Sequence, residues 1–381
     1  MNKIPPIDLG QQYKQIAREV GVAVEQVLAS GYYIGGSEVQ RFEQAFGEYI
    51  GVSDCIGCNS GTDALFLALR ALDIGPGDEA IVPVFTFIAT AEVVSAVGAT
   101  PVFVDIDENT FNLDVGKLEA AITSKTKAII PVHLFGQSAD MTRLMEIART
   151  HRLSVIEDCA QATGATWKGE KVGSIGDIGC FSFFPTKNLG ACGDGGAVTT
   201  NNNAIAAKIR TIKDHGQSSK YNSEVVGINS RLDALQAAIL NIKLRYLDRW
   251  NQRRCHLARR YHRLLGAVPG LILPQEPSFG ESVWNQYTVR VPQQFDGGGS
   301  DLIFDRNVVR ARLAEREVST MVYYPVPLHL QPLYQDLGYQ PGRFPVAERL
   351  SQEVLSLPMF PELTTEQQDS VIYAIKDFLS R

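Results

Sequence analysis

One lysine of the chain stands where a side-chain amine could do covalent chemistry. Lys187 lies in a predicted turn between an apolar, aromatic run at residues 180–184 and a second β-like run at residues 197–199. Pro185 ends the first run because proline has no N–H group for a strand ladder. Most lysines are simply solvated, so the local pattern leaves two alternatives open, an exposed loop lysine and a reactive amine.

Three features that precede Lys187 in the chain could bind a cofactor around it. Asp158 follows an apolar run at residues 153–156, and a buried carboxylate is unfavourable unless it meets a cation or hydrogen-bond donors. Phe87 follows another short apolar run and could offer a ring. The small residues 59–63 precede a helix-forming segment, where N–H groups and the helix dipole favour a phosphate. Each feature also has an ordinary explanation, as a helix cap, a packed ring or a solvated charge.

The combination of these features points to one cofactor. Pyridoxal phosphate needs a lysine amine for a Schiff base, an acid for its pyridinium nitrogen, an aromatic ring and a phosphate site. The chain supplies Lys187, Asp158, Phe87 and the loop 59–63 for these four tasks. Burial and a neighbouring cation can lower the pKa of such a lysine enough for general acid and base catalysis.

The segments around these residues alternate between strand and helix patterns. We expect strands at residues 80–84, 100–105, 128–132 and 153–156, besides the runs on both sides of Lys187. We expect helices at residues 11–30, 37–49, 64–72, 88–97, 115–121, 141–151, 203–214 and 233–254. Such alternation indicates βαβ units and a mostly parallel sheet with helices on both faces, whose sites lie at the carboxyl ends of strands.

From about residue 250 the pattern changes to a smaller α+β unit. Helices are expected at residues 255–265, 306–317, 345–353 and 365–379, and strands at residues 287–291 and 319–322. The glycine-rich residues 295–301 are expected to form a flexible surface loop. The predicted fold class is therefore α/β, with a large domain at residues 1–250 and a small C-terminal domain at residues 251–381.

The composition of the chain restricts its partners. Of its 381 residues 45% are hydrophobic and 20% charged, with a net charge of −6 and no basic block, which argues against nucleic acid. No stretch approaches the roughly 20 apolar residues that span a membrane, and no signal-peptide pattern opens the chain, so we expect a cytoplasmic protein. Cys55 and Cys58 have no second pair at zinc-ligand spacing, so no metal site is expected.

Five motifs of the chain resemble those of one known family. They lie at residues 59–65, 86–90, 157–161, 181–190 and 229–238. In this order, and over nearly the full chain, they are similar to the sugar aminotransferases of the DegT/DnrJ/EryC1/StrS family. That family has the fold-type I architecture of pyridoxal-phosphate enzymes, so the resemblance implies a large domain with a mostly parallel mixed sheet and a smaller C-terminal domain.

The resemblance also implies roles around the cofactor. Lys187 would form the Schiff base and then move a proton between the amino donor and the cofactor. Asp158 would pair with the pyridinium nitrogen, Gln161 would lie near the ring hydroxyl and Phe87 would stack on the ring. The phosphate would be held by residues of both subunits of a homodimer, which are Gly61, Thr62, Ser182 and, from the neighbouring subunit, Asn229.

The resemblance further implies two substrates that bind in turn. L-glutamate would give its amine to the cofactor, forming pyridoxamine phosphate, and a nucleotide-diphosphate keto sugar would then accept the amine. The residues implied near the substrates are Tyr32, Tyr33, Ile34, Asn188, His215, Lys220, Arg231, Tyr323, Tyr324 and His329. The basic residues among them, together with Lys213, are candidates for the diphosphate.

Three alternatives to this reaction stay open. Residues 227–233, with His215 and Gly216 before them, look more like the branch that acts on 3-keto sugars than like the branch that acts on 4-keto sugars. Some sugar dehydratases of the same fold carry histidine where this chain has Lys187, so the lysine favours transamination. The family name partly reflects proteins once thought to be regulatory, but no helix-turn-helix pattern or basic face supports that function here.

Overall fold

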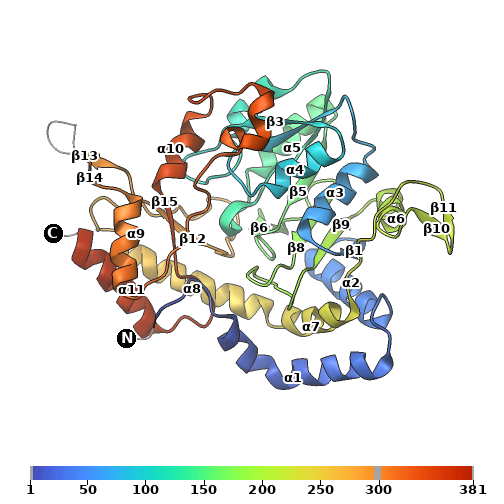
Figure 1. Ribbon diagram of the computed structural model, residues 1–381, viewed down its shortest axis with the longest axis horizontal. Coiled ribbons are helices and arrows are strands. Elements are labelled where there is room, and N and C mark those ends of the chain that lie inside the picture. The colour runs from blue at the N-terminus through green and yellow to red at the C-terminus, as the bar shows by residue number, and fades with distance from the viewer. Residues whose placement is uncertain (1–2, 296–301, 380–381) are drawn as a thin grey trace.

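A seven-stranded sheet forms the centre of the computed structural model, which describes residues 3–295 and 302–379 (Figure 1). The strands are β1 (Asp54–Cys58), β2 (Glu79–Pro83), β3 (Thr100–Val104), β4 (Thr126–Ile129), β5 (Ser154–Asp158), β8 (Ile178–Ser182) and β9 (Gly196–Thr200). Their order is β1-β9-β8-β5-β4-β2-β3, and within this sheet β9 alone runs antiparallel to its neighbours. The mostly parallel mixed sheet that the sequence predicts is confirmed.

The register of the central strands brings three loops to one edge of the sheet. Asp158 at the end of β5 pairs with Cys180 of β8, and Ser182 at the end of β8 pairs with Gly196 of β9. Gly196 also pairs with Cys58, the last residue of β1. The carboxyl ends of β1, β5 and β8 therefore meet at one edge, where ligands bind in such sheets.

Helices cover both faces of the sheet. On one face α3 (Gly61–Ala71), α4 (Ala89–Ala96) and α6 (Asn203–Ile212) share a hydrophobic cluster with the strands. On the other face α2 (Ser37–Ile50), α5 (Met141–His151) and α7 (Ala234–Leu244) form two clusters with the strands. Figure 1 shows α1 (Leu9–Ser30) outside α7, on which it packs through Ile16 and Val20.

Capping side chains explain where several helices begin. Ser60 accepts the Asp63 N–H at 3.0 Å at the start of α3, and Asp140 accepts the Arg143 N–H at 3.2 Å at the start of α5. Asn202 accepts two N–H groups at the start of α6. Such caps satisfy N–H groups that have no partner inside the helix. The helices begin close to the positions that the sequence predicts.

The prediction of one helix at residues 115–121 is wrong. The segment forms two short 3₁₀ helices, Val115–Lys117 and Glu119–Ala121. The Asp114 carboxylate accepts the Gly116 N–H at 2.9 Å, and this local cap together with the flexible glycine favours a tight turn over a continuous α-helix.

Two further predictions of secondary structure are wrong. The helix expected at residues 233–254 ends with α7, and a new helix α8 (Leu247–Leu265) begins after Tyr246, whose hydroxyl bonds Glu19 of α1. The strand expected at residues 319–322 is absent from this described segment, where Met321 forms an isolated bridge to Ser356. In both cases tertiary contacts override the local pattern.

The C-terminal part of the chain has a hydrophobic cluster of its own. It combines β12 (Tyr287–Arg290), β15 (Val354–Leu357), α9 (Arg306–Glu315), α11 (Thr365–Leu379) and the second half of α8. The helix α10 (Pro345–Glu353) packs instead on the cluster that contains α4. Residue 250 lies inside α8, so this helix crosses the predicted domain boundary, and the division of the chain stays a prediction.

Short elements connect the main ones. They are β6 (Thr166–Trp167), β7 (Glu170–Lys171), β10 (Gln217–Ser219), β11 (Asn222–Ser223), β13 (Gln294–Phe295), β14 (Leu302–Phe304) and 3₁₀ helices at Leu134–Gly136, Leu328–Leu330 and Pro332–Leu337. Of the loop predicted at residues 295–301, residues 296–301 lie outside the described residues. Over the described parts of the chain, every helix is too short or too polar to cross a bilayer.

Candidate functional site

The turn that carries Lys187 is closed by backbone contacts. The Lys187 N–H donates to the Phe184 carbonyl at 2.9 Å. A Cβ at Gly190 would lie 2.3 Å from the Pro185 carbonyl oxygen, so only glycine permits this close approach. Proline and glycine around the lysine thus fix the direction in which its side chain leaves the turn.

The surroundings of the Lys187 amine favour its neutral form. Burial lowers the pKa of Lys187, and the negative charge of Asp158 acts in the opposite direction. Among the described residues the amine has neither a hydrogen-bond partner nor an ion pair. A neutral lysine amine is the form that acts as a nucleophile or a general base, so this lysine is equipped for both tasks.

Asp158, at the end of β5, is a buried carboxylate that forms no salt bridge with a described residue. One carboxylate oxygen accepts the Thr90 hydroxyl at 2.8 Å, and the other accepts the Ala160 N–H at 3.1 Å. Burial raises the pKa of Asp158, while these two hydrogen bonds and the charge of Lys187 lower it. A buried carboxylate without a counter-ion fits a protonated ring nitrogen of a ligand.

Removing the Thr90 hydroxyl weakens the binding of such a ligand. In Thr90→Val the side chain keeps its size, but Asp158 loses a hydrogen bond that lowers its pKa, so less of the carboxylate is ionised. We expect the affinity of the apo protein for pyridoxal phosphate, measured by spectroscopic titration, to fall about tenfold. Thr199→Val is the matched control, because its buried hydroxyl bonds the Gly173 carbonyl instead. Equal losses of affinity in the two variants would contradict this role of Thr90.

Gln161 and two aromatic rings lie beside Asp158. The Gln161 amide is held at both ends, because its oxygen accepts the Phe135 N–H at 2.8 Å and its nitrogen donates to the Tyr324 hydroxyl at 3.0 Å. The Tyr324 ring lies 6.3 Å from the ring of Phe87, which is 54% exposed. An exposed ring such as that of Phe87 can stack on a flat heteroaromatic ligand.

The predicted phosphate residues meet at the N-terminus of α3. A Cβ at Gly61 would lie 2.6 Å from the Ser182 Cβ, so glycine is needed for the end of β8 to lie against the helix start. Ser60 caps α3, and Thr62 follows in its first turn. The N–H groups and the dipole of this first turn attract an anion, and two hydroxyl groups lie next to them.

Asn229 lies on a segment that is fixed to the same helix start. The neighbouring Ser230 is buried, and its hydroxyl accepts the Asn59 N–H at 3.1 Å and donates to the Asp63 carboxylate at 2.7 Å. The side chain of Asn229 is exposed. Ser230 has no role in the sequence predictions, and only the folded contact with the loop before α3 reveals it.

The other predicted substrate residues are mostly exposed. Arg231 is half-buried and pairs with Asp214 at 3.3 Å, and Tyr323 lies against Tyr324 with ring centroids 5.8 Å apart. The exposed group, at the end of α1 and near the β10–β11 hairpin, contains Tyr32, Tyr33, Ile34, His215 and Lys220. Within one chain, no hydrogen bond or ion pair between described residues joins this exposed group to Lys187 or Asp158.

Two predicted substrate residues are turned into the protein interior. Asn188 is 3% exposed, and its amide bonds Asn251 and Asn285. His329 is 1% exposed, and its Nε2 lies 3.0 Å from the Glu348 carboxylate. Buried polar groups need such partners. Both side chains are buried within this chain, and their place near a substrate stays a prediction.

Behind Asp158, His133 and Glu157 form a buried pair. His133 Nε2 lies 3.0 Å from Glu157, whose carboxylate also accepts three backbone N–H groups at residues 173–176. The other ring nitrogen of His133 accepts the Ala139 N–H at 3.1 Å. These two residues and Cys159 are of metal-ligand type, but the histidine and the carboxylate already have hydrogen-bond partners on every polar side-chain atom. The pair therefore supports the end of β5.

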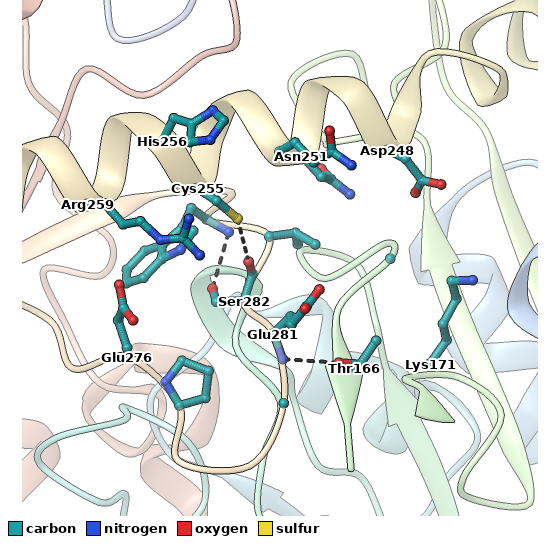
Figure 2. Close-up of a pocket in the computed structure, with 16 residues that line it drawn as sticks. Thr166, Lys171, Asp248, Asn251, Cys255, His256, Arg259, Glu276, Glu281 and Ser282 are labelled. Carbon is teal, nitrogen blue, oxygen red and sulfur yellow. Dashed lines mark hydrogen bonds between the residues drawn. The ribbon is translucent and has the colours of Figure 1, made fainter. Parts of the chain in front are cut away.

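A cavity of about 600 Å³ lies along α8 (Figure 2). Figure 2 shows Asn251, Cys255 and Arg259 of α8 on one side of it, with Glu281 and Ser282 across from them. The predicted cofactor and substrate residues do not line this cavity. The size of this cavity is therefore no guide to the predicted site, because Lys187 and Asp158 do not line it.

Comparisons with known proteins agree over almost the whole chain. A sequence model of the DegT/DnrJ/EryC1/StrS aminotransferase family matches residues 14–376. The chain is 48% identical over 377 residues to a protein of Geobacillus stearothermophilus named "Pleiotropic regulatory protein", covering 98% of both chains. It is 45% identical over 364 residues to the UDP-N-acetyl-3-dehydro-alpha-D-glucosamine 3-aminotransferase of Acidithiobacillus ferrooxidans, covering 96% of this chain and 95% of that one.

The fold agrees equally well with a solved structure. The crystal structure of S. venezuelae DesV in complex with a ketimine intermediate matches with a TM-score of 0.95 and 43% sequence identity, covering 100% of both chains. The two chains are therefore similar in sequence as well as in the arrangement of strands and helices.

Proposed function

Because the chain belongs to the DegT/DnrJ/EryC1/StrS aminotransferase family, we propose that it transfers the amino group of L-glutamate to a nucleotide-linked keto sugar, with pyridoxal phosphate as cofactor. One observation carries the proposal. The Lys187 amine, its pKa lowered by burial, interacts with the charge of a buried Asp158 that has no counter-ion among the described residues. This pair meets two of the four needs of the cofactor, an amine for its aldehyde carbon and a carboxylate for its ring nitrogen.

The side chains around this pair would hold the cofactor in one orientation. Phe87 would stack on the ring, Gln161 would lie near the ring hydroxyl, and Asp158 would hold the proton on the ring nitrogen. The phosphate would lie at the start of α3, against Gly61, Thr62 and Ser182. The exposed ring, the positive helix end and the buried carboxylate support these assignments.

Lys187 would carry the proton in both half-reactions. When bound, pyridoxal phosphate supplies an electron sink and carries the amine from donor to acceptor. The Lys187 Nζ would take the proton from the α-carbon of glutamate, which requires the neutral amine that burial favours. In the second half-reaction the same atom would take part in the reverse proton movement at the sugar carbon.

The keto group at position 3 of the sugar is the preferred acceptor. The residues 227–233 and the 3-aminotransferase named above support this position. His215, Lys220 and Arg231 would meet the diphosphate of the nucleotide. A 4-keto sugar is the alternative acceptor, and a dehydratase of the same fold is disfavoured because Lys187 is present.

A panel of nucleotide-linked 3-keto and 4-keto sugars tests the proposal. The chain, loaded with pyridoxal phosphate, is incubated with each sugar and glutamate, and amino sugar and 2-oxoglutarate are measured by mass spectrometry. We expect amination of 3-keto sugars with equal amounts of 2-oxoglutarate. Amination of 4-keto sugars alone would overturn the position, and loss of water without amination would indicate a dehydratase.

The proposed enzyme is a homodimer with shared sites. The exposed Asn229 of one subunit would reach the phosphate in the site of the other. The exposed residues 32–34 lie against the start of α7, the helix that follows Asn229, because the Ala234 N–H donates to the Tyr33 carbonyl at 2.9 Å. The exposed apolar side chains of Tyr32 and Ile34 support a covering subunit.

Mixing two inactive variants tests the shared site. Lys187→Ala and Asn229→Asp each inactivate every site of their own homodimers, but a mixed dimer contains one site with both native residues. After unfolding and refolding an equal mixture, we expect about a quarter of the native activity. The control mixture of Lys187→Ala with Asp158→Asn does not rise above the residual activity of Asp158→Asn, because both residues belong to the same chain. No recovery in the first mixture would contradict a shared site.

Other parts of the proposal follow from the enzyme class. Nucleic acid and membranes are not proposed as partners, and the expected location is the cytoplasm. The name of the Geobacillus protein indicates a regulatory function for that protein. A purely regulatory function is less well supported for this chain, because it would not explain the buried Lys187 amine next to the charge of Asp158.

A further inference from the structure

The amide of Asn188, the residue that follows Lys187, is bonded on all sides by other segments. Its nitrogen donates to the Asn251 side-chain oxygen at 2.7 Å and to the Val283 carbonyl at 3.0 Å. Its oxygen accepts the Asn285 amide at 2.7 Å. Three buried asparagines therefore hold the lysine turn against α8 and against residues 283–285, the segment that begins at the cavity of Figure 2.

Asn251 connects this network to the segment that carries the aspartate. While its oxygen accepts from Asn188, its nitrogen donates to the Thr163 carbonyl at 3.1 Å. Thr163 belongs to the short segment that follows Asp158, the last residue of β5, and that also carries Gln161. One side chain of α8 thus spans the lysine turn and the aspartate segment.

Asn285 holds the network from the C-terminal part of the chain. Its carbonyl and that of Trp284 accept the guanidinium of the buried Arg254 at 3.2 Å. The same guanidinium donates to the Met359 carbonyl at 2.9 Å. The position of the amide that meets Asn188 is therefore itself fixed by α8.

We propose that Asn188 is a positioning residue, which acts through Asn251 and Asn285 to hold the Lys187 amine at its place relative to Asp158. This inference rests on the proposed function only in that the place of the Lys187 amine matters for transamination. The network can be tested in the apo protein, where the identity of the sugar does not matter.

The test compares Asn188→Ala with the native apo protein. The reaction of the Lys187 amine with an acylating reagent is followed against pH by peptide mass spectrometry, together with hydrogen exchange of residues 184–191. Burial lowers the pKa of Lys187, so a loosened turn that admits water should shift the reaction profile to higher pH. We expect this shift, faster exchange in the turn, and a kcat of the loaded enzyme lower by about 100-fold.

Gln368→Ala is the matched control. Gln368 is also a fully buried amide, and it bonds the Leu257 carbonyl at 2.8 Å and Arg260, within the C-terminal cluster. Its loss should lower the melting temperature without moving the Lys187 profile. If Asn188→Ala fails to fold, Asn285→Ala, which removes one bond of the network, replaces it. An unshifted Lys187 profile and native exchange in the turn, in either network variant, would overturn the inference.

Discussion

Lys187→Ala loses glutamate-dependent transamination, and kcat falls by at least about 10⁴-fold, because one amine serves as covalent anchor and as general base and acid. The visible absorption band that forms when the native apo protein takes up pyridoxal phosphate should be absent or shifted in the variant. The measurement is a spectroscopic titration of both proteins, followed by the amination assay. The closed turn around Lys187 depends on backbone contacts, so the fold should be retained.

The control for this variant is Lys208→Ala. Lys208 is a lysine of α6 that pairs with Asp73 at 2.6 Å on the surface, away from the sheet edge. Its loss should leave the band and the activity at native levels. A Lys187→Ala protein that keeps the native band and turnover would show that another amine binds the cofactor, and the site would have to be placed elsewhere.

Asp158→Asn lowers kcat by roughly 10²- to 10³-fold, since the ring nitrogen loses the buried charge that keeps it protonated. A second effect has a defined sign. The charge of Asp158 raises the pKa of Lys187, so its removal should lower that pKa further. The pH at which the Lys187 amine becomes reactive in the apo protein should therefore move down in Asp158→Asn, measured by acylation against pH.

Asp105→Asn is the matched control for the aspartate. Asp105 is also a buried carboxylate just after a strand of the sheet, but it accepts the N–H groups of Val346 and Ala347 at the start of α10. Its substitution should lower the thermal stability and leave the pH profile of Lys187 unchanged. If both aspartate variants moved the Lys187 profile equally, the effect of Asp158 would be a general loss of structure.

The sheet and the core of the site could be predicted because local patterns encode them. Short apolar runs marked the parallel strands, and Asp158 was found because a carboxylate directly after such a run needs a partner. The helix start at Gly61 was marked by small residues before a helix-forming segment. The register of the strands, with β1 joined through the antiparallel β9, then brings these loop ends to one edge.

The support of the site could not be predicted, because it depends on contacts between distant residues. Asn188 and Asn251 are 63 positions apart, and no periodicity connects them. Thr90 was part of a recognised motif, but its hydroxyl gained a role only when α4 was placed beside β5. Asn188 and His329 are expected near the substrate from the family resemblance alone, and the resemblance carries no information on the contacts that bury both side chains.

The break between α7 and α8 illustrates the same limit. The residues around Tyr246 have good helix-forming neighbours, and the pattern predicts one continuous helix. The contact of Tyr246 with Glu19 of α1 is made in the folded protein, at the point where one helix ends and the next begins. A tertiary contact of this kind leaves no local signal in the sequence.

Transfer of an isotopic nitrogen label tests the central proposal most directly. The chain loaded with pyridoxal phosphate is given glutamate labelled at its amino nitrogen and a nucleotide-linked 3-keto sugar, and the sugar product is analysed by mass spectrometry and NMR. We predict that the label appears on carbon 3 of the sugar and that 2-oxoglutarate forms in equal amount. If none of the keto sugars in the panel acquired the label, the result would contradict the account.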